Sequence, residues 1–398
     1  MGGVYREEYI LMNADPFTIA VPQTDLDDLQ QRLAQTRWPD ELPGSGWDSG
    51  SNLTYMKELV SYWQTTFDWR KQEHLLNAFP QFRVTIDGIG IHFLHVRGNG
   101  PSSLPLILTN GWPSSFVELL TILPMLTDPA SFGDDPADGF DVVIPSLPGW
   151  GFSDRPKERG ITYTRIANIW NRLMSDVLGY PRFGAYGSDI GAIVTSELGR
   201  VSPHQIIGLH LPGMMDFSAL RSDAPPLSEQ ERAYFAELER WMQAEGGYMH
   251  IQRTKPQTLA YGLNDSPAGL AAWIVEKFRA WSDCDGEVER RFTKEELLTN
   301  ISLYWFTQTI PSSIRRYYEN EHTPPTPWRK GERVEVPCAI ARFENRRDHL
   351  PQQPRELAER VYNVVRWTQI PRGGHFPALE EPELLVEDLR AFFRPLRE

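Results

Sequence analysis

One short segment of the chain places an acidic side chain between two glycines at the spacing of a sharp turn. In residues 186–192 (YGSDIGA), one glycine stands two positions before Asp189 and another stands two positions after it. This spacing allows a strand to turn abruptly into a helix and lifts the side chain at the turn clear of the sheet. Ser188 is a weaker candidate, because Tyr186 and Ile190 take the places of the glycines around it. We therefore predict that Asp189 is a nucleophile.

A carboxylate at this point favours attack on an electrophilic carbon. Asp189 cannot form the acyl-enzyme of an esterase, but it can displace a leaving group and form an ester with the substrate. Turnover then needs three further groups. These are hydrogen-bond donors for an oxyanion, a base that activates water to hydrolyse the ester, and an acid that protonates a leaving oxygen.

Candidate oxyanion donors lie after the apolar segment Leu106–Leu108. The sequence Asn-Gly-Trp-Pro follows it at residues 110–113, and a turn there can aim the backbone N–H of Trp112 into the site. The second donor expected in such a site is the N–H of the residue after the nucleophile, here Ile190.

His375 is the predicted base. It follows two glycines in residues 372–376 (RGGHF), after a predicted strand near the C-terminus, and glycines there let the imidazole reach across the sheet edge. Other histidines are less suited: His92, His95 and His210 lie in apolar, strand-like segments and are interpreted as structural, and His349 is a weak competitor.

The base needs a carboxylate that orients it. Asp348 precedes His375 by 27 residues, just after the apolar segment Val336–Ala341, and Glu344 is the alternative at 31 residues. We favour Asp348. The order Asp189, Asp348, His375 is that of an α/β-hydrolase, with an acidic residue in place of the usual serine.

The elements expected around these residues are those of an α/β fold. A hairpin is predicted from strands 83–86 and 89–96 with the turn Asp87-Gly88, and later short strands are predicted at 106–108, 141–144, 183–186, 206–211, 336–341 and 364–368. These strands alternate with helical segments, which predicts a mainly parallel sheet with helices on both faces.

Two other regions lack this alternation. Residues 1–82 include two amphipathic helical segments, 25–35 and 55–67, and predict an N-terminal helical extension that packs on the core and the lid. Residues 227 to about 318 are helical in pattern and rich in aromatic side chains, most of which we assign to packing. We predict core segments at 83–217 and 322–398, separated by a helical lid at 218–321.

Several motifs resemble those of epoxide hydrolases of the microsomal type. Residues 110–113 resemble the HGWP signature of that family, with Asn110 in place of histidine; 146–153 resemble its strand-to-turn segment, and 372–381 (RGGHFPALEE) resemble the stretch around its catalytic histidine. Residues 62–96 resemble the end of the N-terminal region of this branch, and 247–252, 263–267 and 304–317 resemble its lid. The resemblance covers nearly the whole chain.

The resemblance implies that two lid tyrosines bind and protonate the epoxide oxygen. Tyr248 matches the first, and Tyr317 matches the second, with Tyr318 as an adjacent alternative. A phenol suits this role because ring opening produces a strongly basic alkoxide, whereas a carboxylic acid would already be ionised at pH 7. The expected function is conversion of an epoxide and water to a vicinal diol, without metal or cofactor. The alternatives are a haloalkane dehalogenase and an inactive ligand-binding protein of the same fold.

Composition excludes several other classes. The 398 residues are 40% hydrophobic and 12% aromatic, enough for a sizeable core, and the formal net charge of −13 argues against nucleic-acid partners and anionic membrane surfaces. No apolar run suits a membrane span, and Cys284 and Cys338 fit no metal or redox spacing. We expect a cytoplasmic enzyme for a bulky or aryl epoxide; by analogy with the family, it can form a homodimer.

Overall fold

A single mixed sheet lies at the centre of the molecule. The structure is a computed structural model that describes residues 14–213, 225–323, 332–344 and 351–397. Within these residues, nine strands form one sheet in the order β1-β2-β3-β5-β4-β6-β7-β8-β9. The strands are β1 (Asp15–Pro16), β2 (Gln81–Ile86), β3 (Ile89–Val96), β4 (Leu104–Thr109), β5 (Phe140–Pro145), β6 (Phe183–Gly187), β7 (Ile206–Leu211), β8 (Val334–Phe343) and β9 (Tyr362–Ile370).

The type of strand pairing changes once across the sheet, at β5. The pairs from β5 through β4, β6, β7 and β8 to β9 are parallel, whereas β1, β2, β3 and β5 pair antiparallel. Every strand predicted from the sequence lies within an observed strand, and the predicted hairpin is present as β2 and β3. The mainly parallel sheet of an α/β-hydrolase is therefore confirmed.

Helices cover both faces of the sheet, and they bury alternate side chains of each strand. On β4, Ile107 belongs to the apolar cluster that includes α5 and α6, whereas Leu106 and Leu108 belong to the cluster that includes α15. This two-sided burial explains why the central strands are apolar throughout. The helices of this part are α4 (Leu123–Thr127), α5 (Tyr163–Arg172), α6 (Ile190–Val201), α13 (Arg355–Glu359), α14 (Pro377–Glu380) and α15 (Pro382–Phe393).

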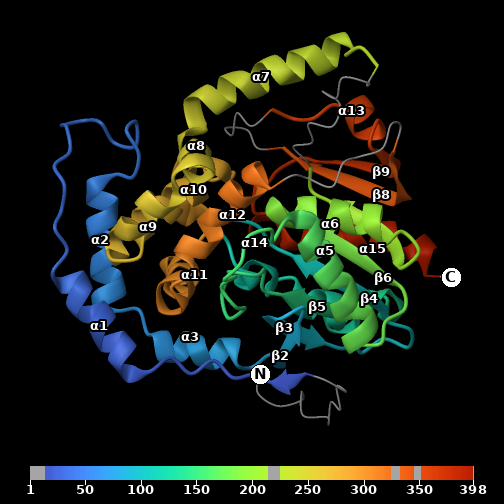
Figure 1. The fold of residues 1–398 in the computed structure, drawn as a ribbon, viewed down its shortest axis with the longest axis horizontal. Helices are drawn as coiled ribbons and strands as arrows, with labels where there is room; N and C mark the ends of the chain where they lie inside the picture. Colours follow the sequence, from blue (N-terminus) through green and yellow to red (C-terminus); the bar gives the residue numbers. More distant parts are fainter. Residues whose placement is uncertain (1–13, 214–224, 324–331, 345–350, 398) are drawn as a thin grey trace.

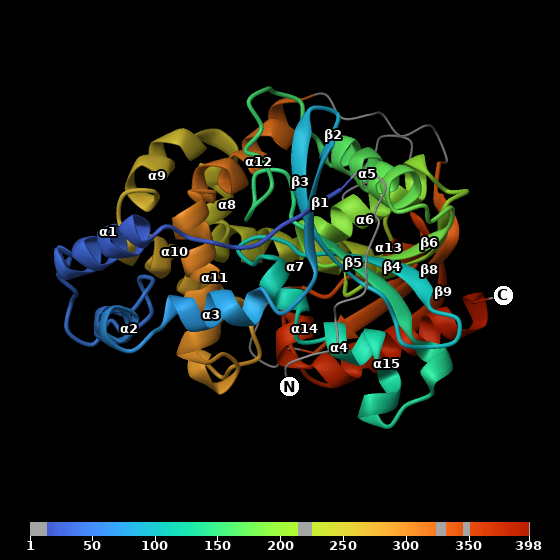
Figure 2. The same ribbon diagram turned by 90° about the horizontal axis from the view of Figure 1, so that it is seen from below.

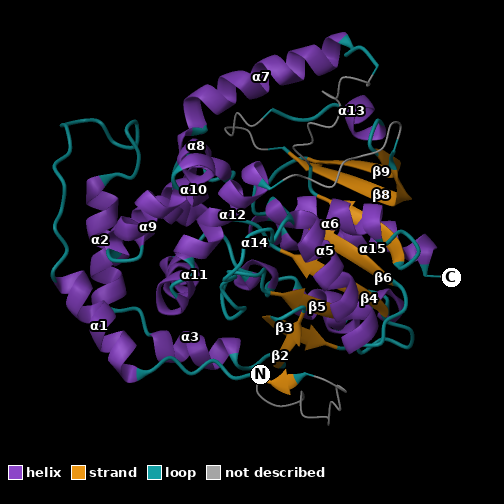
Figure 3. Ribbon diagram, viewed as in Figure 1, coloured by secondary structure: helices purple, strands orange, loops and turns teal. Residues whose placement is uncertain are grey.

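A helical layer lies beside the sheet (Figure 3). Its helices are α7 (Glu229–Glu245), α8 (Gly247–Thr254), α9 (Pro256–Leu263), α10 (Pro267–Trp281), α11 (Lys294–Thr307) and α12 (Ile310–His322). Ser228 and Thr293 begin α7 and α11 with capping boxes, each with a glutamate three residues later. We use the name lid for residues 225–323.

The N-terminal helices lie against the lid; the first two are on the side away from the sheet, and the third runs back toward the sheet (Figure 2). They are α1 (Gln23–Ala34), α2 (Leu53–Thr65) and α3 (Trp69–Leu76). Arg32 pairs with Asp265 at 2.8 Å, and the rings of Trp69 and Phe306 lie 4.8 Å apart. These contacts tie the first part of the chain to the lid.

Two elements of the N-terminal region were absent from the sequence prediction. Asp15–Pro16 pairs with β2 and adds an edge strand, and α3 begins where the Asp68 side chain accepts a hydrogen bond from the Lys71 N–H. A two-residue strand has too few residues to show a periodic pattern. Among the described residues, none of the helices has both the length and the apolar character that a membrane span requires.

Candidate active site

The strand-to-helix turn predicted around Asp189 is present between β6 and α6. Asp189 has a φ of +50°, which few residues other than glycine adopt. A side chain at Gly187 would collide with the Gly191 carbonyl, and one at Gly191 would collide with the Thr109 carbonyl. The two glycines therefore give the turn the close approach that it needs, and the carboxylate projects from the end of the sheet.

The turn that follows β4 lies next to this carboxylate. Because β4 and β6 are parallel neighbours with Thr109 opposite Gly187, the segments after both strands meet at one sheet edge. The Trp112 N–H donates to Oδ1 of Asp189 at 2.9 Å, and a side chain at Gly111 would collide with Asp189. The Trp112 N–H is thus in place to stabilise the negative charge that would form on Oδ1 during hydrolysis of an Asp189 ester.

Asn110 does not contribute its side chain to the carboxylate. It is buried, and its Nδ2 donates to the carbonyl of Gly111 at 2.9 Å. The turn therefore forms with asparagine at the position where the resemblance suggested histidine. Ile190 is the first residue of α6, so its N–H belongs to the helix N-terminus beside Asp189.

His375 faces the other carboxylate oxygen. Its Nε2 lies 3.4 Å from Oδ2 of Asp189, and both side chains are mostly buried, with 16% of His375 and 14% of Asp189 exposed. The imidazole also contacts the ring of Trp281, with the centroids 4.8 Å apart. Nucleophile and predicted base are thus within reach of one reacting group.

Two residues, Asp348 and Glu344, were the sequence candidates for the carboxylate that orients His375. Asp348, like the competitor His349, lies outside the described residues. Glu344 follows the last residue of β8, and its side chain accepts a hydrogen bond from the Gln369 amide of β9. The preference for Asp348 over Glu344 remains a prediction.

Both predicted lid tyrosines lie over the turn that follows β4. The Tyr248 ring stacks on Trp112 at 5.5 Å, and the Tyr317 ring meets the same indole edge-on at 6.1 Å. Burial, aided by the negative charge of Asp189, raises the pKa of Tyr248 well above its ordinary value. Burial, together with Tyr248 and Asp189, does the same for the pKa of Tyr317. Both phenols therefore keep their protons at neutral pH.

The alternative tyrosine is placed elsewhere. The Tyr318 ring stacks on His322 at 3.9 Å, one turn farther along α12. Adjacent residues of a helix point about 100° apart, so Tyr317 and Tyr318 cannot both face Trp112. The geometry favours Tyr317.

Comparison with known proteins extends over almost the entire chain. Residues 14–119 match the family described as epoxide hydrolase N terminus, and residues 106–388 match the alpha/beta hydrolase family. Epoxide hydrolase 1 of Sus scrofa is 36% identical over 95% of this chain and 88% of its own.

Two solved structures are similar to it in fold. The juvenile hormone epoxide hydrolase of the silkworm Bombyx mori has a TM-score of 0.81 and 31% identity, covering 96% of this chain and 94% of that one. The epoxide hydrolase of Aspergillus niger has a TM-score of 0.81 and 29% identity, covering 97% of each. The chain belongs to the epoxide hydrolase family.

The assignment to epoxide hydrolases made from the motifs is confirmed, and so is the expectation of a hydrolase that acts on ethers.

One buried carboxyl group beside the site, that of Glu118, was not predicted from the sequence. Glu118 accepts hydrogen bonds from the hydroxyls of Ser114 and Ser188, and burial raises its pKa to about 7. Ser114 belongs to the turn after β4, and Ser188 precedes the nucleophile. The signal was a single charged residue between Val117 and Leu119 in an apolar segment.

The lid is bonded to the same turn. From α11, Nδ2 of Asn300 donates to the Pro113 carbonyl at 2.9 Å, and the Tyr304 hydroxyl donates to the Ser114 carbonyl at 2.8 Å. From α10, Nζ of Lys277 lies 4.8 Å from the centroid of the Tyr248 ring. None of these side chains was singled out from the sequence, because their partners are far away along the chain.

The site suits displacement and proton transfer. In the part of the chain that the structure describes, no cluster of three or more His, Cys, Asp or Glu side chains is arranged to bind a metal ion. The groups that do converge are a carboxylate, an imidazole, two phenols and a backbone N–H.

Proposed function

We propose that this enzyme converts an epoxide to a vicinal diol through a covalent ester on Asp189. The observation that supports it most directly is the environment of the Asp189 carboxylate. Oδ1 accepts the Trp112 N–H at 2.9 Å, Oδ2 faces His375 at 3.4 Å, and the turn at Trp112 lies beneath the rings of Tyr248 and Tyr317.

In the first step, Oδ2 of Asp189 attacks one ring carbon, and the bond from that carbon to the ring oxygen breaks. Tyr248 and Tyr317 donate hydrogen bonds to the ring oxygen, which takes a proton from one of them and becomes a hydroxyl. Because both phenols are buried and protonated, they offer protons where the alkoxide develops.

In the second step, His375 removes a proton from water, and the hydroxide attacks the ester carbonyl. The negative charge forms on Oδ1, where the N–H groups of Trp112 and Ile190 stabilise it. The bond from the carbonyl carbon to the diol oxygen then breaks, and that oxygen takes the proton held by His375, which releases the diol. The new Asp189 carboxyl loses its proton, and the tyrosine that protonated the ring oxygen regains one, so the starting state is restored. Asp348 orients His375 in this scheme. Every step is a nucleophilic attack or a proton transfer among side chains, substrate and water, so we expect neither metal nor organic cofactor.

The substrate proposed is a bulky or aryl epoxide. The aromatic rings around the carboxylate, those of Trp112, Tyr248, Trp281 and Tyr317, favour an apolar substituent on the epoxide. The similar silkworm protein is named for juvenile hormone, a relation that supports a bulky substrate here. The homodimer and the cytoplasmic location remain predictions.

A single-turnover reaction in water labelled with heavy oxygen tests the covalent route. With enzyme in excess over styrene oxide, the first diol takes its new oxygen from Asp189, and the label enters the peptide that contains Asp189. Direct attack by water would instead label the diol and leave the peptide unchanged.

Two alternatives are distinguished by measuring diol formation from styrene oxide and, in a separate reaction, chloride release from a chloroalkane. A haloalkane dehalogenase would release chloride from a chloroalkane and would form no diol from the epoxide. Ile190 provides no side-chain donor for a halide, and the two phenols suit an oxygen leaving group, which favours the epoxide. An inactive binding protein would take up the epoxide without turnover.

A further inference from the structure

The loop that contains His375 lies directly on the end of the lid helix α10. The His375 N–H donates to the carbonyl of Trp281, the last residue of α10, at 2.9 Å. A Cβ at Gly374 would lie 2.6 Å from that carbonyl oxygen and 2.8 Å from Cα of Ser282, so only glycine permits this approach. The position of the imidazole therefore depends on the lid as well as on the sheet.

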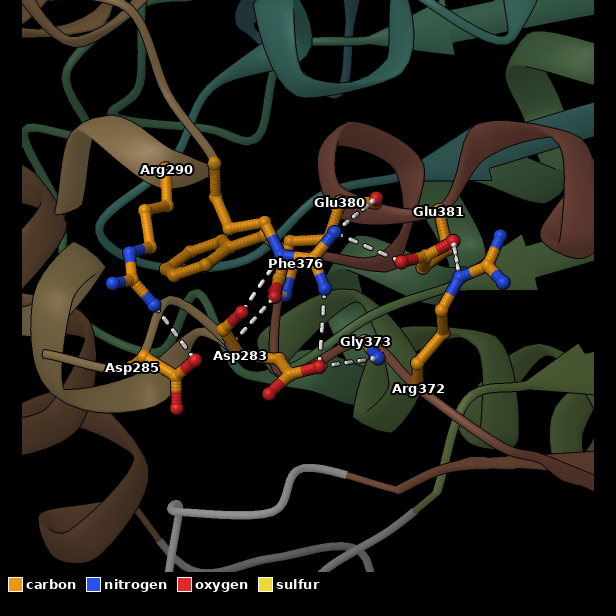
Figure 4. Close-up of polar contacts among 9 residues, drawn as sticks. Asp283, Asp285, Arg290, Arg372, Gly373, Phe376, Glu380 and Glu381 are labelled. Atoms are coloured by element: carbon orange, nitrogen blue, oxygen red, sulfur yellow. Dashed lines mark hydrogen bonds and ion pairs between the residues drawn. The ribbon is translucent and has the colours of Figure 1, made fainter. Parts of the chain in front are cut away.

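Glu380 bonds to the backbone on both sides of this contact (Figure 4). Its Oε1 accepts the N–H of Phe376, the residue after His375, at 2.9 Å. Its Oε2 accepts the N–H of Asp283, two residues beyond α10, at 2.7 Å. The two oxygens of one carboxylate thus connect the histidine loop to the lid.

This carboxyl is buried at an energetic cost. Only 6% of Glu380 is exposed, and burial raises its pKa to about 7, although the two N–H groups act in the opposite direction. A buried carboxyl is unfavourable unless its oxygens are hydrogen-bonded. The neighbouring Glu381 is also buried, but its partners are the side chains of Arg291 at 2.9 Å and Arg372 at 2.6 Å. Glu380 therefore differs from Glu381 in bonding backbone on both sides of the histidine.

We propose that Glu380 is a positioning residue for His375, which fixes the imidazole by joining the N–H of Phe376 to the N–H of Asp283 in the lid. This inference rests on the proposed function, in which His375 acts only when the ester is hydrolysed. Loss of Glu380 should therefore slow hydrolysis of the ester and spare its formation. A base misplaced by about 1 Å can lose about 10²-fold in rate.

The experiment measures the two steps separately in Glu380→Gln and Glu380→Ala with styrene oxide. Rapid mixing with quenching and intact-protein mass spectrometry gives the rates of ester formation and ester loss. We expect ester loss to fall about 10²-fold in Glu380→Ala, with ester formation unchanged. Glu380→Gln should fall between Glu380→Ala and wild type, because its single carbonyl oxygen can accept only one of the two N–H groups.

Glu381→Gln is the matched control. It removes a buried carboxylate of the same loop, so it should lower the melting temperature and leave the rate of ester loss unchanged. Equal slowing of both steps in the Glu380 variants, or no slowing of either, would overturn the inference. If His375→Gln also fails to accumulate ester, the proposed function itself is wrong, and the inference falls with it.

Amide hydrogen exchange gives a second test, and its measurement on the wild-type enzyme needs no variant. In the wild-type enzyme, the N–H groups of Phe376 and Asp283 should both exchange slowly. In Glu380→Ala, which removes both acceptors, they should exchange faster together, with no change at Trp112. Rapid exchange of either amide in the wild type would overturn the proposal.

Discussion

The two sides of the active site are positioned by different parts of the structure. Asp189 and Trp112 follow β6 and β4, which are adjacent parallel strands, so sheet hydrogen bonds determine their relative position. Tyr248 and Tyr317 come from α8 and α12 of the lid, and His375 comes from a loop bonded to the end of α10 (Figure 1). The nucleophile thus depends on local turns, whereas the acids and the base depend on packing between distant segments.

This difference corresponds to the two chemical steps. Attack on the epoxide needs the sheet side together with the lid tyrosines, and hydrolysis of the ester needs the sheet side together with His375. Substitutions on the sheet side should therefore affect both steps, and those on the other side should affect one step each. The following predictions test this division, from the largest expected effect to the smallest.

Asp189→Asn should abolish steady diol formation, because the amide is a poor nucleophile and no ester forms. The expected decrease in kcat is about 10⁴-fold or more, as when other enzymes lose their nucleophile. Asp87→Asn is the control, since Asp87 also has a φ of +50° but lies in the hairpin turn. A normal rate of diol release from Asp189→Asn would disprove the covalent route.

His375→Gln should separate the steps. Ester formation continues, but hydrolysis loses its base and should slow by about 10²- to 10⁴-fold, so the alkyl-enzyme accumulates. Intact-protein mass spectrometry after mixing with substrate detects this adduct. His322→Gln, which changes a histidine of α12, should behave as wild type. Rapid turnover without His375 would contradict the division between the steps.

Tyr248→Phe and Tyr317→Phe should each slow ester formation and leave ester hydrolysis unchanged. A hydrogen bond to a charged group contributes about 1.5–3 kcal/mol, so each loss should lower the rate about 10- to 100-fold. The double variant should be slower than either single one. Tyr318→Phe is the matched control, because that ring stacks on His322. Equal effects of the Tyr317 and Tyr318 substitutions would contradict the orientation of α12 that directs Tyr317, and not Tyr318, toward Trp112.

Glu118→Gln should alter the pH dependence of stability. Burial raises the pKa of Glu118 to about 7 in the folded protein, above its ordinary value of 4.5. Between these values the unfolded chain releases the proton and the folded chain keeps it, so stability decreases as pH rises. The glutamine does not titrate, so the variant should lack this pH-dependent decrease in the free energy of unfolding. The decrease is on the order of 3 kcal/mol, since one pKa unit equals about 1.4 kcal/mol. Urea unfolding of both proteins at pH 5 and pH 7 measures the difference; identical pH dependence would contradict the prediction.

The sequence predicted the sheet side of the site well, because local rules determine it. The glycines around Asp189 and the turn containing Trp112 lie within a few residues of the groups that they position. Adjacent glycines likewise pointed to His375. These residues meet because parallel strands bring their carboxyl ends to one edge.

The sequence was less informative about the lid side. It could not distinguish Tyr317 from Tyr318, because that choice depends on the orientation of α12 relative to Trp112. Glu118 and Glu380 were not recognised, since their roles follow from hydrogen bonds rather than from spacing. The predicted domain boundaries, like the choice of Asp348, remain predictions.

The two hydrogen bonds from α11 to the turn after β4 limit how the lid could be exchanged between relatives. Asn300 and Tyr304 donate to the carbonyls of Pro113 and Ser114. Pro113 and Ser114 directly follow Trp112, whose N–H donates to Asp189. A chimera that received a foreign lid without these two side chains would leave two buried carbonyls unsatisfied. Engineering of substrate range is therefore better directed at α8 and α12, with α11 inherited together with the sheet.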